Sequence, residues 1–143
     1  MNNKFMQFAI EQAKKVKNEI PVGAVVVKDG EIIAQTNNTK ENDNDITSHA
    51  EIIALQKASK ALKNWRLYSC DMYVTLEPCP MCAWAILQSR IKNIYFGSYD
   101  NKYGGFSVAH LEKISEFKPN IYGGICENDC DKLLKDFFGN LRK

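Results

Sequence analysis

One histidine, two cysteines and a free glutamate, grouped in two short motifs, constrain this 143-residue chain most strongly. His49-Ala50-Glu51 is followed further along by Pro78-Cys79-Pro80-Met81-Cys82. Imidazole nitrogen and thiolate sulfur are ligands that zinc prefers. A structural zinc is closed by four protein ligands, whereas a catalytic zinc keeps one position open for water, whose pKa then falls toward about 7. Three ligands and one spare carboxylate therefore predict an open, catalytic zinc site.

The spacing within each motif predicts that both motifs lie at the starts of helices. Cys79 and Cys82 are three residues apart, so their sulfurs would share one helix face, and Pro80 suits the first helical turn. The positive end of the helix dipole would favour both thiolates. Because Glu51 is two residues from His49, it would point away from the imidazole, and we expect it to act as a proton shuttle.

Other interpretations of these motifs remain open at this point. Ser48 to Glu51 also fits a capping box, in which the Glu51 carboxylate accepts a hydrogen bond from the Ser48 backbone N–H. The C-x-x-C pair alone could be a redox pair. A fourth cysteine could also close the zinc site, and the candidates are Cys70, Cys126 and Cys130. The joint order H-x-E then P-C-x-x-C favours a deaminase-type zinc site, which has this signature.

Composition limits the class of protein. With 45% hydrophobic and 25% charged residues, residues 1–143 are expected to form one globular domain. The segment 1–17 has charges at helical spacing without an apolar leader, and no apolar run is long enough to cross a bilayer, so we expect a cytoplasmic protein without a membrane partner. Five cysteines favour thiols and metal ligands over disulfides. A net charge of +2 neither requires nor excludes nucleic acid.

Hydrophobic periodicity predicts an α/β fold, a three-layer α/β/α sandwich with a central mixed five-stranded sheet. Two strands flanking Asp29-Gly30 are expected to form a hairpin, and the crossover after the third strand implies parallel neighbours there. The last helix is expected to bury Leu133, Leu134, Phe137 and Phe138. The predicted strands cover 22–27, 31–35, 72–76, 91–97 and the vicinity of 121–122. The predicted helices cover 5–16, 52–62, 79–89, a short stretch at 109–114, and 128–141.

Longer stretches around the motifs resemble the bacterial tRNA-specific adenosine deaminases of the cytidine deaminase superfamily, over nearly the whole chain. The resemblance is carried by 21–25, 47–51, 73–83, 89–91, Phe96-Gly97, Asp100 and Lys102. It implies zinc held by His49, Cys79 and Cys82, and Glu51 as the catalytic residue. The implied reaction is hydrolytic deamination of adenosine to inosine at the wobble position of a tRNA anticodon loop. The alternative is a free-base or nucleoside deaminase, acting on guanine or cytosine with the same zinc site.

The resemblance also implies substrate contacts. Asn38 matches a position that hydrogen-bonds the target base, and Asp100 and Lys102 match a loop on the substrate side. Ile20 and Leu76 are candidates for apolar pocket walls, or else plain core residues. The candidate phosphate contacts are Lys92, Lys102, Arg90, Arg142 and Lys143.

Two partners follow from the same resemblance, a tRNA anticodon stem-loop and a second copy of the chain in a homodimer. Some apolar side chains exceed what one small core needs and would suit such an interface, although burial in the core is the commoner explanation for them; they are Trp84, Ile86, Leu87, Tyr95 and Tyr99.

The chain departs from the family pattern in two loops. Ile46 and Ser48 flank Thr47 where the family usually has a proline and an alanine, and the loop 39–45 is unlike the usual one. After Lys102 the loop 103–107 is one residue shorter and adds Tyr103 and Phe106. We therefore expect the edge that faces RNA to differ from that of other members.

Overall fold

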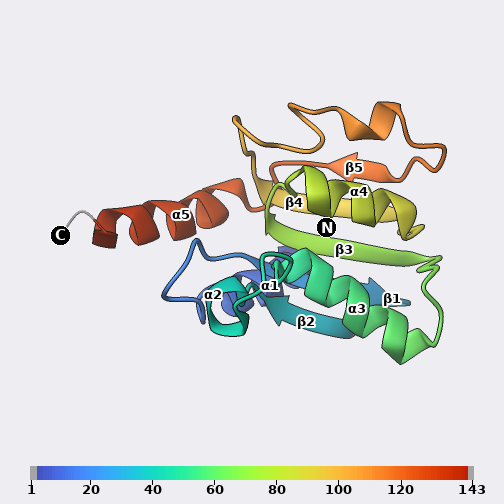
Figure 1. Ribbon diagram of the computed structural model, residues 1–143, viewed down its shortest axis with the longest axis horizontal. Helices are drawn as coiled ribbons and strands as arrows, with labels where there is room; N and C mark the ends of the chain where they lie inside the picture. Colours follow the sequence, from blue (N-terminus) through green and yellow to red (C-terminus); the bar gives the residue numbers. More distant parts are fainter. Residues whose placement is uncertain (1–2, 142–143) are drawn as a thin grey trace.

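A mixed five-stranded sheet forms the centre of the computed structural model, which describes residues 3–141 (Figure 1). β1 pairs antiparallel with β2 and with β3, whereas the β3–β4 and β4–β5 pairs are parallel. The predicted mixed sheet and the parallel neighbours after the third strand are thus confirmed. In sheet order the strands are β2 (Glu31–Asn37), β1 (Gly23–Lys28), β3 (Cys70–Leu76), β4 (Asn93–Ser98) and β5 (Asn120–Tyr122).

The hairpin between β1 and β2 turns where the sequence predicted it. Asp29 and Gly30 both have positive φ, 51° and 78°. Two consecutive residues of this conformation form the tight turn whose twist matches that of the flanking strands. Lys28 consequently pairs with Glu31, directly across the turn.

Helices cover both faces of the sheet, which confirms the three-layer α/β/α sandwich. α3 (Ala50–Leu62) and α4 (Pro80–Gln88) pack on one face, and α1 (Asn3–Ala13) with the first turns of α5 (Glu127–Leu141) packs on the other (Figure 1). Alternate residues of the central strands supply the two cores, because successive side chains of a strand point to opposite faces. Val26 and Val74 face α3 and α4, whereas Val25 and Tyr73 face α1.

The sheet brings the starts of α3 and α4 to the same edge. β3 ends at Leu76 and α4 begins at Pro80, so the chain passes from strand to helix within a few residues. α3 and α4 run beside each other from this edge (Figure 1). The carboxyl edge of parallel strands is where α/β sheets place their ligand sites.

The C-terminal helix corrects one prediction. Leu133, Leu134 and Phe137 are only partly buried, and Phe138 is 41% exposed. The reason is geometric, since the far half of α5 extends beyond the sheet and has no layer to pack against (Figure 1). The expected helix near 109–114 is also reduced to a 3₁₀ turn, η1 (Leu111–Lys113), and a short α2 (Lys40–Asp43) stands in the loop after β2.

Within residues 3–141, none of the helices combines the length and the apolar character that crossing a membrane requires.

Gly23 provides a test of how α1 packs on the sheet. A side chain there would overlap the carbonyl oxygen of Ala9, so Gly23→Ala should push α1 off β1 and lower the free energy of unfolding by about 1–3 kcal/mol. Gly139→Ala is the matched control, because nothing lies within 4 Å of its added methyl group. Urea unfolding should show this control unchanged or more stable by up to about 1 kcal/mol. Equal stability of the two variants would contradict the packing.

Candidate metal centre and substrate pocket

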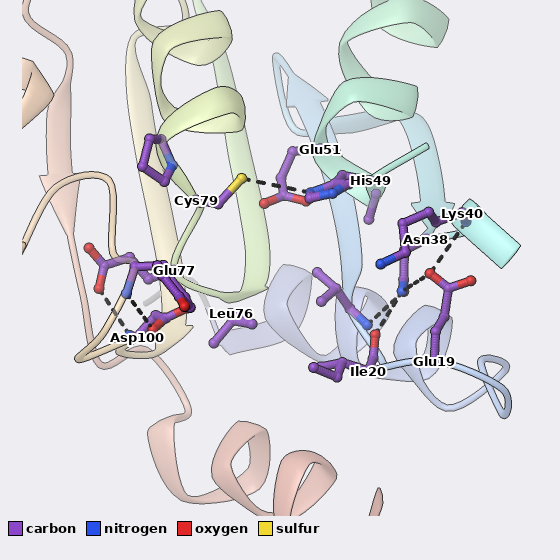
Figure 2. Close-up of a pocket in the computed structure, with 14 residues that line it drawn as sticks. Glu19, Ile20, Asn38, Lys40, His49, Glu51, Leu76, Glu77, Cys79 and Asp100 are labelled. Atoms are coloured by element: carbon purple, nitrogen blue, oxygen red, sulfur yellow. Dashed lines mark hydrogen bonds between the residues drawn. The ribbon is translucent and has the colours of Figure 1, made fainter. Parts of the chain in front are cut away.

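His49, Cys79 and Cys82 lie together at the carboxyl edge of the sheet (Figure 2). The Nδ1 atom of His49 is 3.4 Å from the Cys82 sulfur and 3.8 Å from the Cys79 sulfur. One imidazole nitrogen and two sulfurs, all within 4.8 Å of one another, form a soft donor set that suits zinc. The structure thus brings together the three residues predicted as ligands, and the group could hold a metal ion.

Both ligand motifs open a helix, as their spacing predicted. His49 is the N-cap of α3 and Cys79 is the N-cap of α4, with Pro80 in the first turn. Neither N-cap side chain makes a capping hydrogen bond to its helix. An extended backbone at each cap instead leaves these side chains available to the shared site. The positive ends of two helix dipoles therefore converge on the sulfurs, which favours thiolates.

Hydrogen bonds among the ligands shift their protonation. The Cys82 thiol hydrogen-bonds to Cys79, which lowers the pKa of Cys79 to about 4 despite partial burial. The same hydrogen bond, together with burial, raises the pKa of Cys82. The hydrogen bond to Cys79 also raises the pKa of His49. The group thus retains protons that a metal ion would displace on binding.

Glu51 is a buried carboxyl group beside this cluster. Its side chain projects from the first turn of α3 and the residue is only 4% exposed. Burial raises the pKa of Glu51 to about 7. A carboxyl group of this kind can both accept and release a proton near neutral pH.

The capping-box interpretation of Glu51 is wrong. The N-cap of α3 is His49 rather than Ser48, and the helix has no side-chain cap hydrogen bond. The backbone N–H of Ser48 donates instead to the carbonyl oxygen of Asp45, 3.1 Å away.

The closed-site interpretation also lacks a fourth ligand within residues 3–141. No further histidine, cysteine or acidic residue of this range joins the three ligand atoms. Cys70 is buried at the start of β3, away from the carboxyl edge. Cys130 lies in the core on the other face of the sheet, where burial raises its pKa to about 12. All five cysteines are free, so Cys79 and Cys82 are not paired in a disulfide.

A cavity of about 370 Å³ opens beside the cluster. Four of the five predicted substrate-binding residues line it, namely Ile20, Asn38, Leu76 and Asp100. Figure 2 shows Asn38 and Ile20 on one side of the cavity, Asp100 on the other, and Leu76 between them. The fifth, Lys102, does not line the cavity, because its exposed side chain lies over the ring of Tyr103.

Asn38 is already engaged by the chain itself. Its Oδ1 accepts from the Val22 backbone N–H, and its Nδ2 donates to Glu19 Oε1 and to the Ile20 carbonyl oxygen, at 2.7–2.9 Å. Both amide hydrogens are therefore used within the cavity wall. A base could still donate to the second lone pair of Oδ1.

Two carboxylates that were not predicted organise the walls of the cavity. Glu19 accepts from Asn38 and from the backbone N–H groups of Lys40 and Glu41, so it ties the segment before β1 to α2. Glu77 is 2% exposed and accepts four hydrogen bonds from across the loop 100–107. Its donors are the backbone N–H groups of Asp100, Phe106 and Ser107 and the Ser107 hydroxyl.

Of these two carboxylates, only Glu77 could have been suspected from the sequence, because it directly precedes the cysteine motif. Glu19 stands in no motif, and its role depends on partners that lie far along the chain. Lys40 and Tyr103 also line the cavity and were not predicted to do so.

Two of the basic residues predicted to contact phosphate, Arg90 and Lys92, lie away from the cavity. Arg90 and Lys92 precede β4, at the edge of the sheet opposite the cluster, and the Arg90 guanidinium lies over the rings of Trp65 and Phe117. Arg142 and Lys143 lie outside the described residues.

Comparisons with known proteins agree with this geometry. The family model for MafB19-like deaminases matches residues 2–142. The tRNA-specific adenosine deaminase of Bacillus subtilis (strain 168) is 43% identical over 145 residues, which cover 97% of this chain and 89% of that protein. Its counterpart in Agrobacterium fabrum (strain C58 / ATCC 33970) is 40% identical over 144 residues, which cover 96% and 94%.

A solved structure from a study of A-to-I editing by tRNA:A34 deaminases at the wobble position superimposes with a TM-score of 0.89. It is 39% identical, and the match covers 92% of this chain and 99% of that one. Both motifs lie at one edge of the sheet, and the relatives match over nearly their whole length. The chain therefore belongs to the MafB19-like deaminase family and to the family of the tRNA-specific adenosine deaminases.

Proposed function

We propose that this protein converts adenosine to inosine by hydrolytic deamination at the wobble position of a tRNA anticodon loop. The observation that carries the proposal is the buried Glu51 carboxyl beside an open His49, Cys79 and Cys82 group, at a cavity of about 370 Å³. The family to which the chain belongs supports the substrate, because its relatives are named for tRNA adenosine.

Zinc is the cation that we assign to the His49, Cys79 and Cys82 group. An open zinc site activates water for attack near neutral pH. Glu51 would then take a proton from the attacking water and pass protons to the ring nitrogen and to the leaving amine, so that C6 of adenine gains oxygen and ammonia departs. Its buried position beside the ligand group places it to accept and to release a proton at the reacting atoms.

The cavity fits a single base that has left its stack. Its volume lies at the lower end of the range for small-molecule sites. A base must be unpaired and unstacked to enter such a cavity, which costs least in a single-stranded loop. Leu76 and Ile20 would supply apolar walls to the bound adenine, while Asn38 and Asp100 would supply polar contacts.

A homodimer and a cytoplasmic location complete the proposal. Trp84 and Tyr99 are 39% and 44% exposed, which supports a covered surface on the outer side of α4 and near the loop 100–107. Ile86 and Leu87 do not contribute to it, because both are fully buried in the core beneath α4, which is the commoner of the two explanations for these residues.

The test of substrate class compares RNA with free bases. We expect release of ammonia and formation of inosine from an anticodon stem-loop that has adenosine at the wobble position, and no deamination of guanine or cytosine. Mass spectrometry of digested RNA and an ammonia assay measure the two products. Deamination of a free base with no reaction on the stem-loop would establish the free-base alternative instead.

Glu51→Gln should remove the proton shuttle and leave the metal in place. We expect kcat on the stem-loop to fall by at least about 10²–10⁴-fold, the usual contribution of a general acid–base group. Zinc content, measured by plasma mass spectrometry, should stay at the wild-type level because Glu51 is outside the ligand group. Glu116→Gln is the control, since Glu116 is exposed and lies outside the cavity. Retention of kcat in the Glu51 variant would refute the assigned role.

Removal of the metal should affect both activity and stability. A chelator should abolish deamination and lower the Tm, because a cation that binds only the folded chain stabilises it by about 2.7 kcal/mol at 100 times its Kd. Added Zn²⁺ should restore both properties, whereas Mg²⁺ should restore neither because it prefers oxygen ligands. Chelated protein that keeps its activity and its Tm, as measured by calorimetry, would rule out the metal centre.

A further inference from the structure

We propose that Tyr103 is a stacking platform for the nucleobase next to the edited adenosine, and that it sets how well that neighbouring base is accepted. This inference rests on the proposed function, since it concerns the RNA that enters the same site. Tyr103 departs from the family pattern in the sequence, and the structure places it in the wall of the cavity.

Tyr103 lies at the rim of the cavity. It lines the cavity together with Asp100 and Glu77, yet the residue is 59% exposed. When one base enters the cavity, the RNA strand continues past the rim on both sides of it. An exposed ring at that rim therefore meets a neighbouring nucleotide, and single-stranded bases are commonly bound by stacking on aromatic side chains.

The backbone beneath the ring is held in place. The Tyr103 N–H donates to Asp100 Oδ1 at 2.9 Å, and the Lys102 N–H donates to the same oxygen at 3.0 Å. The Gly104 N–H donates to the Asp100 carbonyl oxygen at 3.0 Å. Asp100 is fixed in turn by its own N–H bond to the buried Glu77 carboxylate, 3.1 Å long. Figure 2 shows Glu77 and Asp100 together on this wall.

A fixed platform has an energetic advantage over a mobile one. Ordering a free loop on binding reduces affinity, whereas a loop that is already hydrogen-bonded has less conformational freedom to lose. Tyrosine itself has few rotatable bonds for its area, which keeps that loss small.

The charge next to the ring also fits a nucleotide. The Lys102 ammonium lies 5.1 Å from the centre of the Tyr103 ring. A cation over one face leaves the other face for a base, and the same ammonium can contact the phosphate of that nucleotide. Lys102, which the sequence predicted on the substrate side, would then act at the rim rather than within the cavity.

The test separates a stacking ring from an ordinary surface tyrosine. On the intact anticodon stem-loop, Tyr103→Ala should lower kcat/KM by about 5-fold to 150-fold, the range for loss of one stacked base, mainly through KM. Tyr103→Phe should stay within twofold of wild type, because the ring is kept. Tyr68→Ala is the matched control, since Tyr68 is 52% exposed but stands before β3, at the opposite edge of the sheet. It should be unchanged.

A second arm identifies the contacted nucleotide. Stem-loops with an abasic site placed in turn on each side of the adenosine are assayed with wild type and with Tyr103→Ala. The loss caused by the substitution should shrink on one of these substrates, because the base that stacks on the ring is gone. Zinc content and Tm of each variant establish that the site is intact.

The outcomes of these assays distinguish failure of the Tyr103 inference from failure of the proposed function. The inference is overturned if Tyr103→Ala matches wild type on the intact stem-loop, if Tyr103→Phe loses as much as alanine, or if the loss is the same on both abasic substrates. Failure of the wild-type protein on every stem-loop would instead overturn the proposed function.

Discussion

The convergence of two helix starts at one edge of the sheet is the constraint on which the site depends. The N-cap side chains of α3 and α4, His49 and Cys79, make no capping hydrogen bond and instead belong to one group that could hold a metal ion. β2 and β3 both pair antiparallel with β1, so they end at the same edge of the sheet, and the packing of α3 and α4 on one face brings the starts of these helices within reach of each other. Loss of that packing would separate His49 from the cysteines.

Two buried glutamates on neighbouring segments show how surroundings decide a side chain's role. Glu77 accepts four hydrogen bonds, which hold the loop 100–107 against the cavity. Glu51 lies beside the sulfurs, and burial raises its pKa to about 7. The first carboxylate is suited to fixing a wall and the second to moving protons, although both are nearly inaccessible to solvent.

Much of the fold was predictable because the central elements have clear periodicity. The β1–β2 hairpin, β3 and the cysteine helix α4 appear close to their predicted positions, since buried strands and turn residues leave strong local patterns. The prediction errors fall where contacts with distant parts of the chain decide the local structure. α5 has the amphipathic pattern of a buried helix, yet its far half lies beyond the sheet. Ser48 and Glu51 match a capping box, but the helix begins one residue later.

The sequence by itself determined which three residues could hold a metal and the likeness to a family, because zinc motifs and helix starts depend on spacings of a few residues. Only the tertiary structure decided the shape of the cavity. Glu19 reaches Asn38 across 19 positions, and Glu77 reaches Ser107 across 30. Hydrogen bonds between such distant residues form only after the sheet has set the loops side by side, so no local pattern encodes them.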